Sequence, residues 1–290
     1  MDSLTHALVA VLLFNAPFSG QAVLFGILGA TLPDIDILLK KISDRDPELF
    51  AFSHGGFTHS IAGILAVSAG IVIGFLLWQN LAGRTGDLSS LFLVCAFACA
   101  GGMTHVMLDV LAFPGIPLLY PFTARKFTAG IFAGPSLVFL GVSLGLFLLF
   151  LFGYPVLPAL PAVAVCGGVY ILIHVLLKVF VGLKHKGITI PTYNPLKWLV
   201  IQGSSDSFTV YRTGLLAENG NMTVYPRYDG VNPEFIHRHM SDPELQRLAY
   251  YSYIMVAGSE GDTVVIRDPL REDGTLFYPP AFTRVSIPKD

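Results

Sequence analysis

The sequence predicts an all-α polytopic membrane domain followed by a small α+β soluble domain. Of the 290 residues, 53% are hydrophobic and 13% are charged, and the mean hydropathy is +0.64, outside the usual balance of a soluble globule. Residues 1–183 hold seven Lys or Arg and eight Asp or Glu, against eleven and twelve in residues 184–290. This split predicts a membrane domain over 1–185 and a soluble domain over 190–290.

The charge balance and the cysteines exclude several classes of protein. The formal net charge of −2 rules out a strongly basic nucleic-acid-binding protein, so no nucleic-acid partner is expected. The three cysteines are odd in number and lie in apolar runs, which argues against a disulfide-stapled secreted fold. The composition is that of an integral membrane protein.

The apolar runs define about six membrane segments. A helix needs about 20 apolar residues to cross a bilayer. The opening residues 1–39 are interrupted around Pro17 and Gly20, which disfavour helix interiors and suit a turn, so we expect a helical hairpin there. The predicted segments are the hairpin arms 3–14 and 21–39, and the four spans 59–81, 91–113, 130–152 and 157–182.

The basic residues predict the orientation in a bacterial or archaeal cytoplasmic membrane. If six segments alternate, the Lys and Arg of the 40–58 loop, of the 114–129 loop and of the exit from the last span all lie on one side. The opposite side has only Arg84. Positive residues accumulate in cytoplasmic loops, so both termini and the soluble domain are expected in the cytoplasm.

After residue 184 the pattern changes to short runs rich in β-branched and aromatic residues. Such runs cover 198–201, 208–211 and 263–266, and Gly, Asn, Asp and Ser clusters separate them. An amphipathic helix is expected over about 233–256, beginning at Pro233. The soluble domain is therefore predicted to mix strands and helices. The sequence does not identify a protein partner for it.

Seven ionisable side chains of the membrane domain carry the functional signal. An ionisable group inside a membrane segment is costly, so it usually has a partner and a function. In the six-segment topology all seven fall within a few turns of the cytoplasmic ends. They are His6, Asp34, Asp36, His54, His59, His105 and Asp109.

The spacing of these residues fits a metal site. His105 and Asp109 lie four apart on an expected helix and so share one face, where they could bind one ion, or the carboxylate could orient the histidine. Asp34 and Asp36 would face different sides of a regular helix, but the preceding Pro33 suggests an irregular helix end where both could face inward. Mixed His and Asp ligation favours Zn²⁺, with Mn²⁺ and Fe²⁺ as alternatives.

The chain resembles the bacterial and archaeal family of inner-membrane-associated, metal-dependent hydrolases of the LexA-binding type. The resemblance covers residues 1 to about 185, and the 194–198 stretch resembles the soluble extension of some members. It implies a membrane-embedded hydrolase. The motifs that carry it are Thr5-His6, Leu32-Pro33-Asp34-Ile35-Asp36, His54-Gly55-Gly56-Phe57-Thr58-His59-Ser60, His105-Val106-Met107-Leu108-Asp109 and Tyr120-Pro121-Phe122.

A looser resemblance is to zinc-dependent phospholipases C and nucleases of similar helical fold, which carry an early His, an Asp, a His and a His-x-x-x-Asp in the same order. It implies that His6, one of the two aspartates Asp34 and Asp36, His59 and the His105/Asp109 pair are ligands. The membrane domain has no second His-x-x-x-Glu pair downstream. One or two ions are therefore expected rather than three.

Together these features predict a membrane-bound metal-dependent hydrolase in which a metal-activated water attacks an ester. A phosphoester of a lipid at the cytoplasmic bilayer surface is favoured, because a soluble substrate would gain nothing from a membrane-embedded site. Asp36 is the candidate general base or second-ion ligand, and it could exchange roles with Asp34. Arg125 and Lys126 could bind the substrate phosphate, or simply anchor the loop. The candidate ligands are His6, Asp34, His54, His59, His105 and Asp109.

The alternative class is a non-enzymatic membrane protein, in which the same residues form a structural metal site and the soluble domain binds a protein. A transport path would need polar residues at several depths, whereas the other halves of the predicted spans are almost purely apolar. This disfavours transport.

Overall fold

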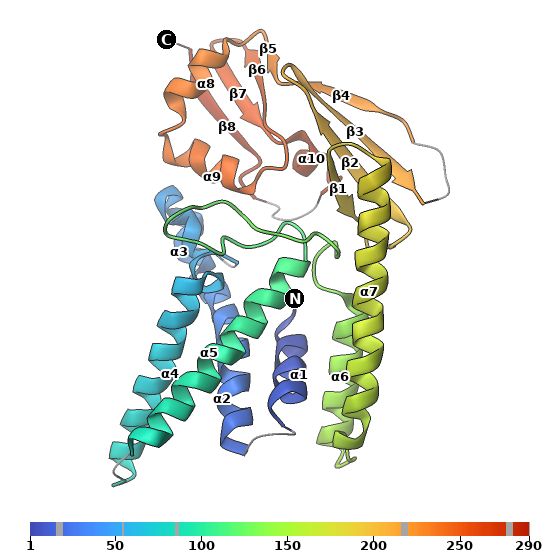
Figure 1. Cartoon of the computed structure of the whole chain (residues 1–290). Helices are drawn as coiled ribbons and strands as arrows, with labels where there is room; N and C mark the ends of the chain where they lie inside the picture. The colour runs from blue at the N-terminus through green and yellow to red at the C-terminus, as the bar shows by residue number, and fades with distance from the viewer. Residues whose placement is uncertain (16–19, 54, 85–86, 216–219, 277–280, 290) are drawn as a thin grey trace. The chain divides into compact units, whose positions relative to one another are not determined.

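A computed structural model describes residues 1–15, 20–53, 55–84, 87–215, 220–276 and 281–289. The chain forms two compact units, one helical and one containing the sheets (Figure 1). The helical unit comprises Met1–Lys41, Ala51–Phe180 and Ile190–Pro195. The sheet unit comprises Ile42–Phe50, Val181–Thr189 and Leu196–Asp290.

The helical unit is built from apolar helices with polar caps. Ser60, Asp87 and Ser136 accept backbone N–H bonds at the starts of α4, α5 and α6, which fixes where these helices begin. Short helical turns link the longer elements: η1 (Leu32–Leu39), α3 (Lys40–Arg45), η2 (Pro47–Phe52), η3 (Phe57–His59) and η4 (Leu157–Ala159). The main helices are α1 (Ser3–Phe14), α2 (Gly20–Thr31), α4 (Ile61–Leu81), α5 (Leu88–Leu111), α6 (Leu137–Leu151) and α7 (Leu160–Lys184).

Four helical segments of the described chain are long and apolar enough to cross a bilayer, so the prediction of six spans is not supported. They are Gly20–Leu38, Ile61–Leu81, Leu88–Leu111 and Leu157–Lys184. The predicted arm 3–14 and the predicted span 130–152 do contain the helices α1 and α6, but these are only 12 and 15 residues long. Both helices are apolar but shorter than the about 20 residues that a crossing needs.

The span predicted over 130–152 is shortened because residues 130–136 are not helical. The N–H groups of Ile131 and Phe132 donate to the carbonyl of Leu111, at 2.9 and 3.2 Å. These bonds hold the segment against the end of α5. Pro135 disfavours a helical conformation at the residue before it, and Ser136 caps the helix that begins at Leu137. The continuous apolar pattern concealed this non-helical segment.

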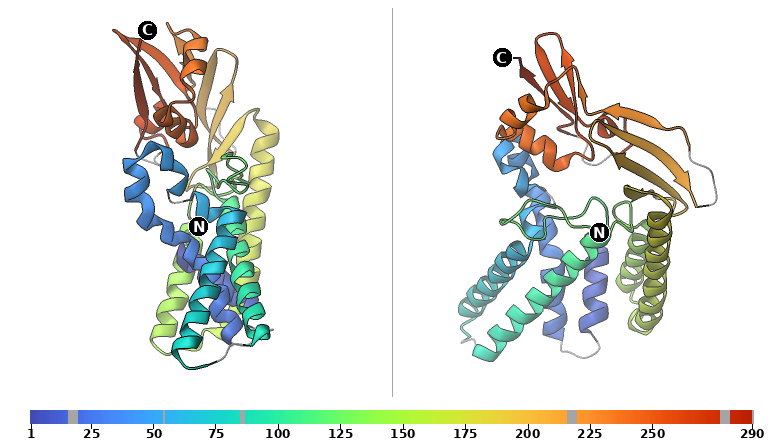
Figure 2. Two further views of the ribbon diagram at one scale, coloured as in Figure 1. Left: turned by 90° about the vertical axis from the view of Figure 1, so that its left-hand side faces the viewer. Right: turned by 45° about the horizontal axis from the view of Figure 1, so that its top comes forward.

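Helices α2 and α5 pack with their backbones in direct contact (Figure 2). A Cβ added at Gly29 would lie 2.0 Å from the carbonyl oxygen of Ala98, and one at Gly101 would lie 2.0 Å from that of Gly26. Only small residues permit so close an approach, which is the usual way for membrane helices to associate. Elsewhere the helices expose large apolar side chains, such as Leu65, as helices in contact with lipid do.

The sheet unit contains two four-stranded sheets, ordered β1-β2-β3-β4 and β5-β6-β7-β8. The second sheet packs against α8 and α9 through buried residues that include Phe235, Leu245, Leu248 and Ile266. Its helices are α8 (Pro233–His239), α9 (Pro243–Tyr251) and α10 (Pro269–Glu272). The strands are β1 (Ile188–Pro191), β2 (Lys197–Gly203), β3 (Ser207–Gly214), β4 (Thr223–Pro226), β5 (Tyr228–Asp229), β6 (Val256–Glu260), β7 (Thr263–Arg267) and β8 (Arg284–Pro288).

The three predicted strands are confirmed as parts of β2, β3 and β7, but the single helix predicted over 233–256 is wrong. The structure divides it into α8 and α9, and its last residue begins β6. The division falls at Asp242, whose carboxylate accepts the N–H of Glu244 at 2.8 Å and so caps a new helix. Pro243 occupies the first turn of α9, where its missing N–H costs nothing.

Candidate metal centre

Five side chains from four separate elements of the helical unit converge on one buried point. His6 comes from α1, Asp34 from η1, His59 from η3, and the pair His105 and Asp109 from the last two turns of α5. The three histidines are at most 1% exposed, and Asp109 is 7% exposed. Two overlapping groups of potential ligands result, His6 with His105 and Asp109, and Asp34 with His59 and His105.

The local backbone structure positions these side chains at the cluster. After Pro33 the chain tightens into the 3₁₀ helix η1, where Asp34 and Asp36 both reach His59. The Ser3 hydroxyl, at the start of α1, donates to Asp34 Oδ2 at 2.6 Å. His59 ends η3 directly before Ser60, the residue that caps α4.

The ligand atoms are spaced as they would be around a single ion. Asp109 Oδ1 lies 3.3 Å from His6 Nε2, and Asp109 Oδ2 lies 3.3 Å from Nε2 of both His59 and His105. Asp34 Oδ1 lies 3.4 Å from His59 Nε2 and 3.7 Å from His105 Nε2. Two ligand atoms at tetrahedral angles, with metal bonds of 2.0–2.1 Å, would be separated by about 3.3 Å. The cluster therefore has the dimensions of a zinc site.

A second layer of acceptors orients two of the histidines. His105 Nδ1 donates to the carbonyl oxygen of Ala30 at 2.7 Å, which leaves Nε2 as the nitrogen that faces the cluster. His59 Nδ1 lies 3.2 Å from Asp36 Oδ2, and the Thr58 hydroxyl and the Gly55 N–H donate to the same oxygen. Carboxylates and carbonyls behind ligating histidines are the usual outer partners of protein metal sites.

Several buried polar atoms of the cluster lack a hydrogen bond. Among the described residues, no hydrogen-bond partner is found for three of these atoms: the two ring nitrogens of His6 and Nε2 of His105. Buried polar atoms are nearly always satisfied, and those that are not call for a missing partner. An ion bound to the two Nε2 atoms would supply that partner for these atoms, though not for Nδ1 of His6. The residues present thus fit a metal ion.

Charge is also concentrated at the centre. Burial disfavours the charged imidazole of His59, but hydrogen bonds to the carboxylates of Asp34 and Asp36 outweigh burial and raise the pKa of His59 to about 9. The α-amino group of Met1 donates to Asp109 Oδ1. Positive charge among the carboxylates is therefore stabilising, as a cation site requires.

The remaining predicted site residues lie elsewhere. His54 is outside the described residues. Arg125 is exposed and Lys126 is half-buried, both in the loop between α5 and α6, and neither belongs to the two ligand groups. Two further residues of the site were not predicted. Ala30 accepts the hydrogen bond of His105 with its main-chain oxygen, and Ser3 donates to Asp34. Only the polar character of Ser3 at the start of an apolar helix gave a signal.

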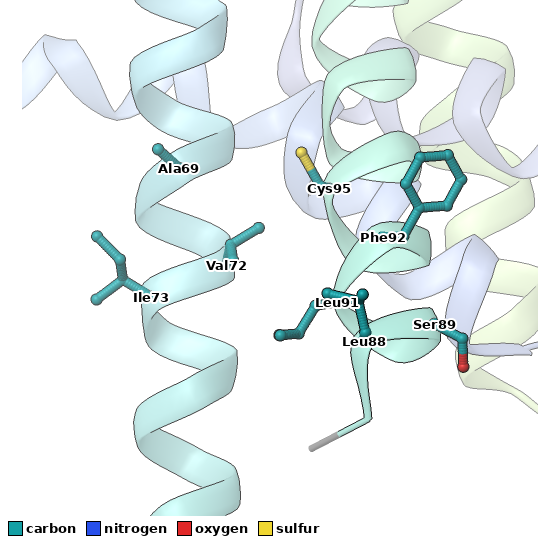
Figure 3. Close-up of a pocket in the computed structure, with 8 residues that line it drawn as sticks. All are labelled: Ala69, Val72, Ile73, Leu88, Ser89, Leu91, Phe92 and Cys95. Carbon is teal, nitrogen blue, oxygen red and sulfur yellow. The ribbon is translucent and has the colours of Figure 1, made fainter.

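An apolar groove between α4 and α5 lies away from this centre (Figure 3). Its walls include Val72 and Ile73 of α4, and Leu88, Phe92 and Cys95 of α5. At 1.5 Å per residue, Cys95 lies about 15 Å along α5 from the level of the first ligand on that helix. The lining residues of the groove include no His, Asp or Glu, and none of them belongs to the two ligand groups, so the groove is separate from the candidate metal site.

A helical unit with several bilayer-length helices and a buried cluster of His and Asp defines the class: an integral membrane protein with a candidate metal centre. Residues 1–181 match the YdjM inner membrane protein family, and the chain belongs to that family. No curated protein and no solved structure has significant similarity to the chain. Membership confirms the inner-membrane part of the predicted resemblance. The hydrolase activity and the side of the membrane on which each terminus lies remain predictions.

Proposed function

We propose that the protein is a membrane-embedded, metal-dependent hydrolase whose substrate is a phosphoester of a lipid. The observation that carries the proposal is the convergence of five ligand side chains whose histidines are oriented from behind by Ala30 and Asp36. A bound Zn²⁺ would lower the pKa of a coordinated water and stabilise negative charge on the attacked oxygen. A site at the end of α5, within a helical membrane unit, favours a lipid as substrate.

The two aspartates of η1 receive different roles in this proposal. Asp36 is 1% exposed, and its Oδ2 already accepts bonds from Thr58 and Gly55 beside His59, so it acts as a positioning residue. Asp34 is more open, with 12% of its side chain exposed, and its Oδ1 faces the ligand nitrogens. We therefore assign Asp34 as the carboxylate that binds the ion or takes up a proton from water.

A structural metal site is the second candidate function, favoured by the near-complete burial of the cluster. Three histidines and two aspartates could fill the coordination shell of zinc, and a shell closed by protein atoms leaves no position for a reacting water. In that case the sheet unit would carry the function, as a surface for a protein partner.

Elemental mass spectrometry of the detergent-purified protein tests the metal centre. We expect stoichiometric zinc or manganese that is lost in the His59→Ala/His105→Ala double variant. The His237→Ala/His239→Ala variant, altered in α8 of the sheet unit, serves as the matched control and should keep the metal. A protein that stays metal-free after reconstitution would refute the hydrolase.

Turnover then separates the two functions. The metal-loaded protein is assayed against a panel of phospholipids and soluble phosphoesters, with Asp34→Asn as the variant. Metal-dependent release of phosphate or of a phosphorylated headgroup, lost in that variant, supports the hydrolase. Stoichiometric metal without turnover on any member of the panel supports the structural site.

A further inference from the structure

A second group of polar side chains lies inside the helical unit, on one face of α7. Tyr170, His174 and Lys178 are spaced four residues apart, so their side chains follow one another along the same side of the helix. Within the four candidate spans, Lys178 is the only Lys or Arg that is not a terminal residue of its span. A cation placed there is costly and usually serves a function.

This face of α7 packs against the segment that follows α5. The ring of Tyr170 stacks on Phe132 with centroids 5.7 Å apart, and His174 lies 4.8 Å from the same ring. His174 Nδ1 donates to the carbonyl of Tyr170 at 2.9 Å, which fixes the imidazole. The Tyr170 and Ser136 hydroxyls lie 3.4 Å apart. The polar face is therefore ordered.

The ammonium group of Lys178 lies beside Gly130, in the same segment. A Cβ built on Gly130 would come 3.4 Å from Lys178 Nζ and 3.8 Å from its Cε. Gly130 has φ +58°, a conformation that glycine adopts readily and other residues rarely do. The end of the lysine side chain thus lies near the Gly130 backbone, and the ring of Phe113, 3.6 Å from the same built atom, lies there too.

The backbone on both sides of Gly130 is bonded to the metal-centre end of α5. Ala129 N–H donates to the carbonyl of Val110 at 2.6 Å, and Ile131 N–H donates to that of Leu111 at 2.9 Å. These acceptors are the two residues directly after Asp109. The backbone beside which the ammonium group lies is therefore bonded to the end of α5 that follows Asp109.

We propose that Lys178 binds the phosphate group of an anionic lipid presented to the metal centre. This inference rests on the proposed function. Three aspartates lie at the centre, and the Met1 α-amino group is already bonded to one of them, so a further cation would favour an anionic substrate there. Lys178 supplies this positive charge from within a candidate membrane span. Arg125 and Lys126, by contrast, lie in the loop between α5 and α6. An ammonium group is a common partner of phosphate.

Binding of short-chain lipids to the detergent-solubilised full chain tests this proposal. Dihexanoyl phosphatidic acid, dihexanoyl phosphatidylcholine and inorganic phosphate are titrated by calorimetry into the wild type, Lys178→Gln, Lys178→Arg and Lys184→Gln. The last variant removes the same charge at the end of the same helix. We expect Lys178→Gln to bind phosphatidic acid about ten- to a hundredfold more weakly, as for one lost charge-assisted hydrogen bond. Lys178→Arg and Lys184→Gln should bind close to wild type.

Three results would overturn the proposal: equal binding of phosphatidic acid and phosphatidylcholine by the wild type, wild-type affinity in Lys178→Gln, or equal losses in the two Gln variants. Binding of inorganic phosphate but not phosphatidic acid would overturn the lipid as source of the phosphate.

Metal content, measured on the same samples, separates the two proposals. If the wild type is metal-free but its lipid binding depends on Lys178, only the proposed hydrolase is refuted. If the wild type holds metal but its lipid binding does not depend on Lys178, only the proposed lysine site is refuted. Unchanged metal content in Lys178→Gln shows that the variant is folded.

Discussion

The contact between α2 and α5 makes the metal centre sensitive to a methyl group placed at Gly101. In Gly101→Ala the new Cβ would lie 2.0 Å from the carbonyl oxygen of Gly26 and 3.0 Å from the nitrogen of Ala30. Real contacts of this kind are not shorter than about 3 Å, so the helices must separate by about 1 Å. The bond from His105 Nδ1 to Ala30 O, now 2.7 Å, would lengthen to about 3.7 Å and be lost.

Loss of this bond removes the acceptor that orients His105. Outer partners of this kind typically contribute 10- to 100-fold to metal affinity, so we expect zinc to bind about that much more weakly in Gly101→Ala. The overpacked interface should also lower the free energy of unfolding by about 1–3 kcal/mol.

Zinc affinity is measured by competition with a chromophoric chelator, and folding by circular dichroism of the same sample. Gly70→Ala is the control: it adds the same methyl group to membrane helix α4, where nothing lies within 4 Å of the new atom. A folded Gly101→Ala protein that binds zinc with wild-type affinity would refute the claim that helix contact positions His105.

The other predictions concern the ligands, the ion and the sheet unit. Asp36→Asn should weaken zinc binding about 10- to 100-fold without changing the stoichiometry at saturation, because Asp36 orients His59; an unchanged affinity in the competition titration would contradict that role. Asp109→Asn should lose stoichiometric zinc by elemental analysis, whereas Asp87→Asn, at the exposed start of the same helix, should keep it. Zinc at a hundred times its Kd should stabilise the protein by about 2.7 kcal/mol, so a chelator should lower the thermal midpoint of the wild type but not of the His59→Ala/His105→Ala variant. Asp242→Ala should cost the sheet unit about 1 kcal/mol by loss of the α9 cap, with zinc content unaffected; a change in zinc content would contradict the separation of the two units.

Much of this organisation could be predicted from local patterns. The helices α1 and α2, the long apolar helices and three strands follow from hydrophobic periodicity. The turn predicted around Pro17 lies outside the described residues, and Gly20, which was expected in that turn, is the first residue of α2. The i, i+4 spacing of His105 and Asp109 survives in any regular helix, and both side chains do face one cluster. The inward turn of Asp34 and Asp36 was expected from Pro33, and the structure gives it a form: a 3₁₀ helix whose two aspartates contact opposite nitrogens of His59.

Other features depend on tertiary contacts that a single sequence does not encode locally. Residues 130–136 continue the apolar run, yet they are not helical, and the N–H groups of Ile131 and Phe132 bond to Leu111 at the end of α5 instead. The role of Ala30 was invisible for a similar reason, since any residue offers the same main-chain carbonyl. The position of Lys178 beside Gly130 likewise depends on a tertiary contact between α7 and the segment after α5, and no local pattern predicts it.

The small residues of α2 and α5 connect helix packing with chemistry. Gly26, Gly29, Ala98 and Gly101 bring the two backbones together, and the same approach sets Ala30 O at hydrogen-bond distance from His105. Because η1 continues directly from α2, that contact also places the two aspartates of η1 opposite the ligands of α5. Much of the geometry of the candidate site is therefore set by helix association. An ion need only satisfy nitrogens that the fold has already buried, and such preorganisation lets a site in a membrane hold a cation without large rearrangement.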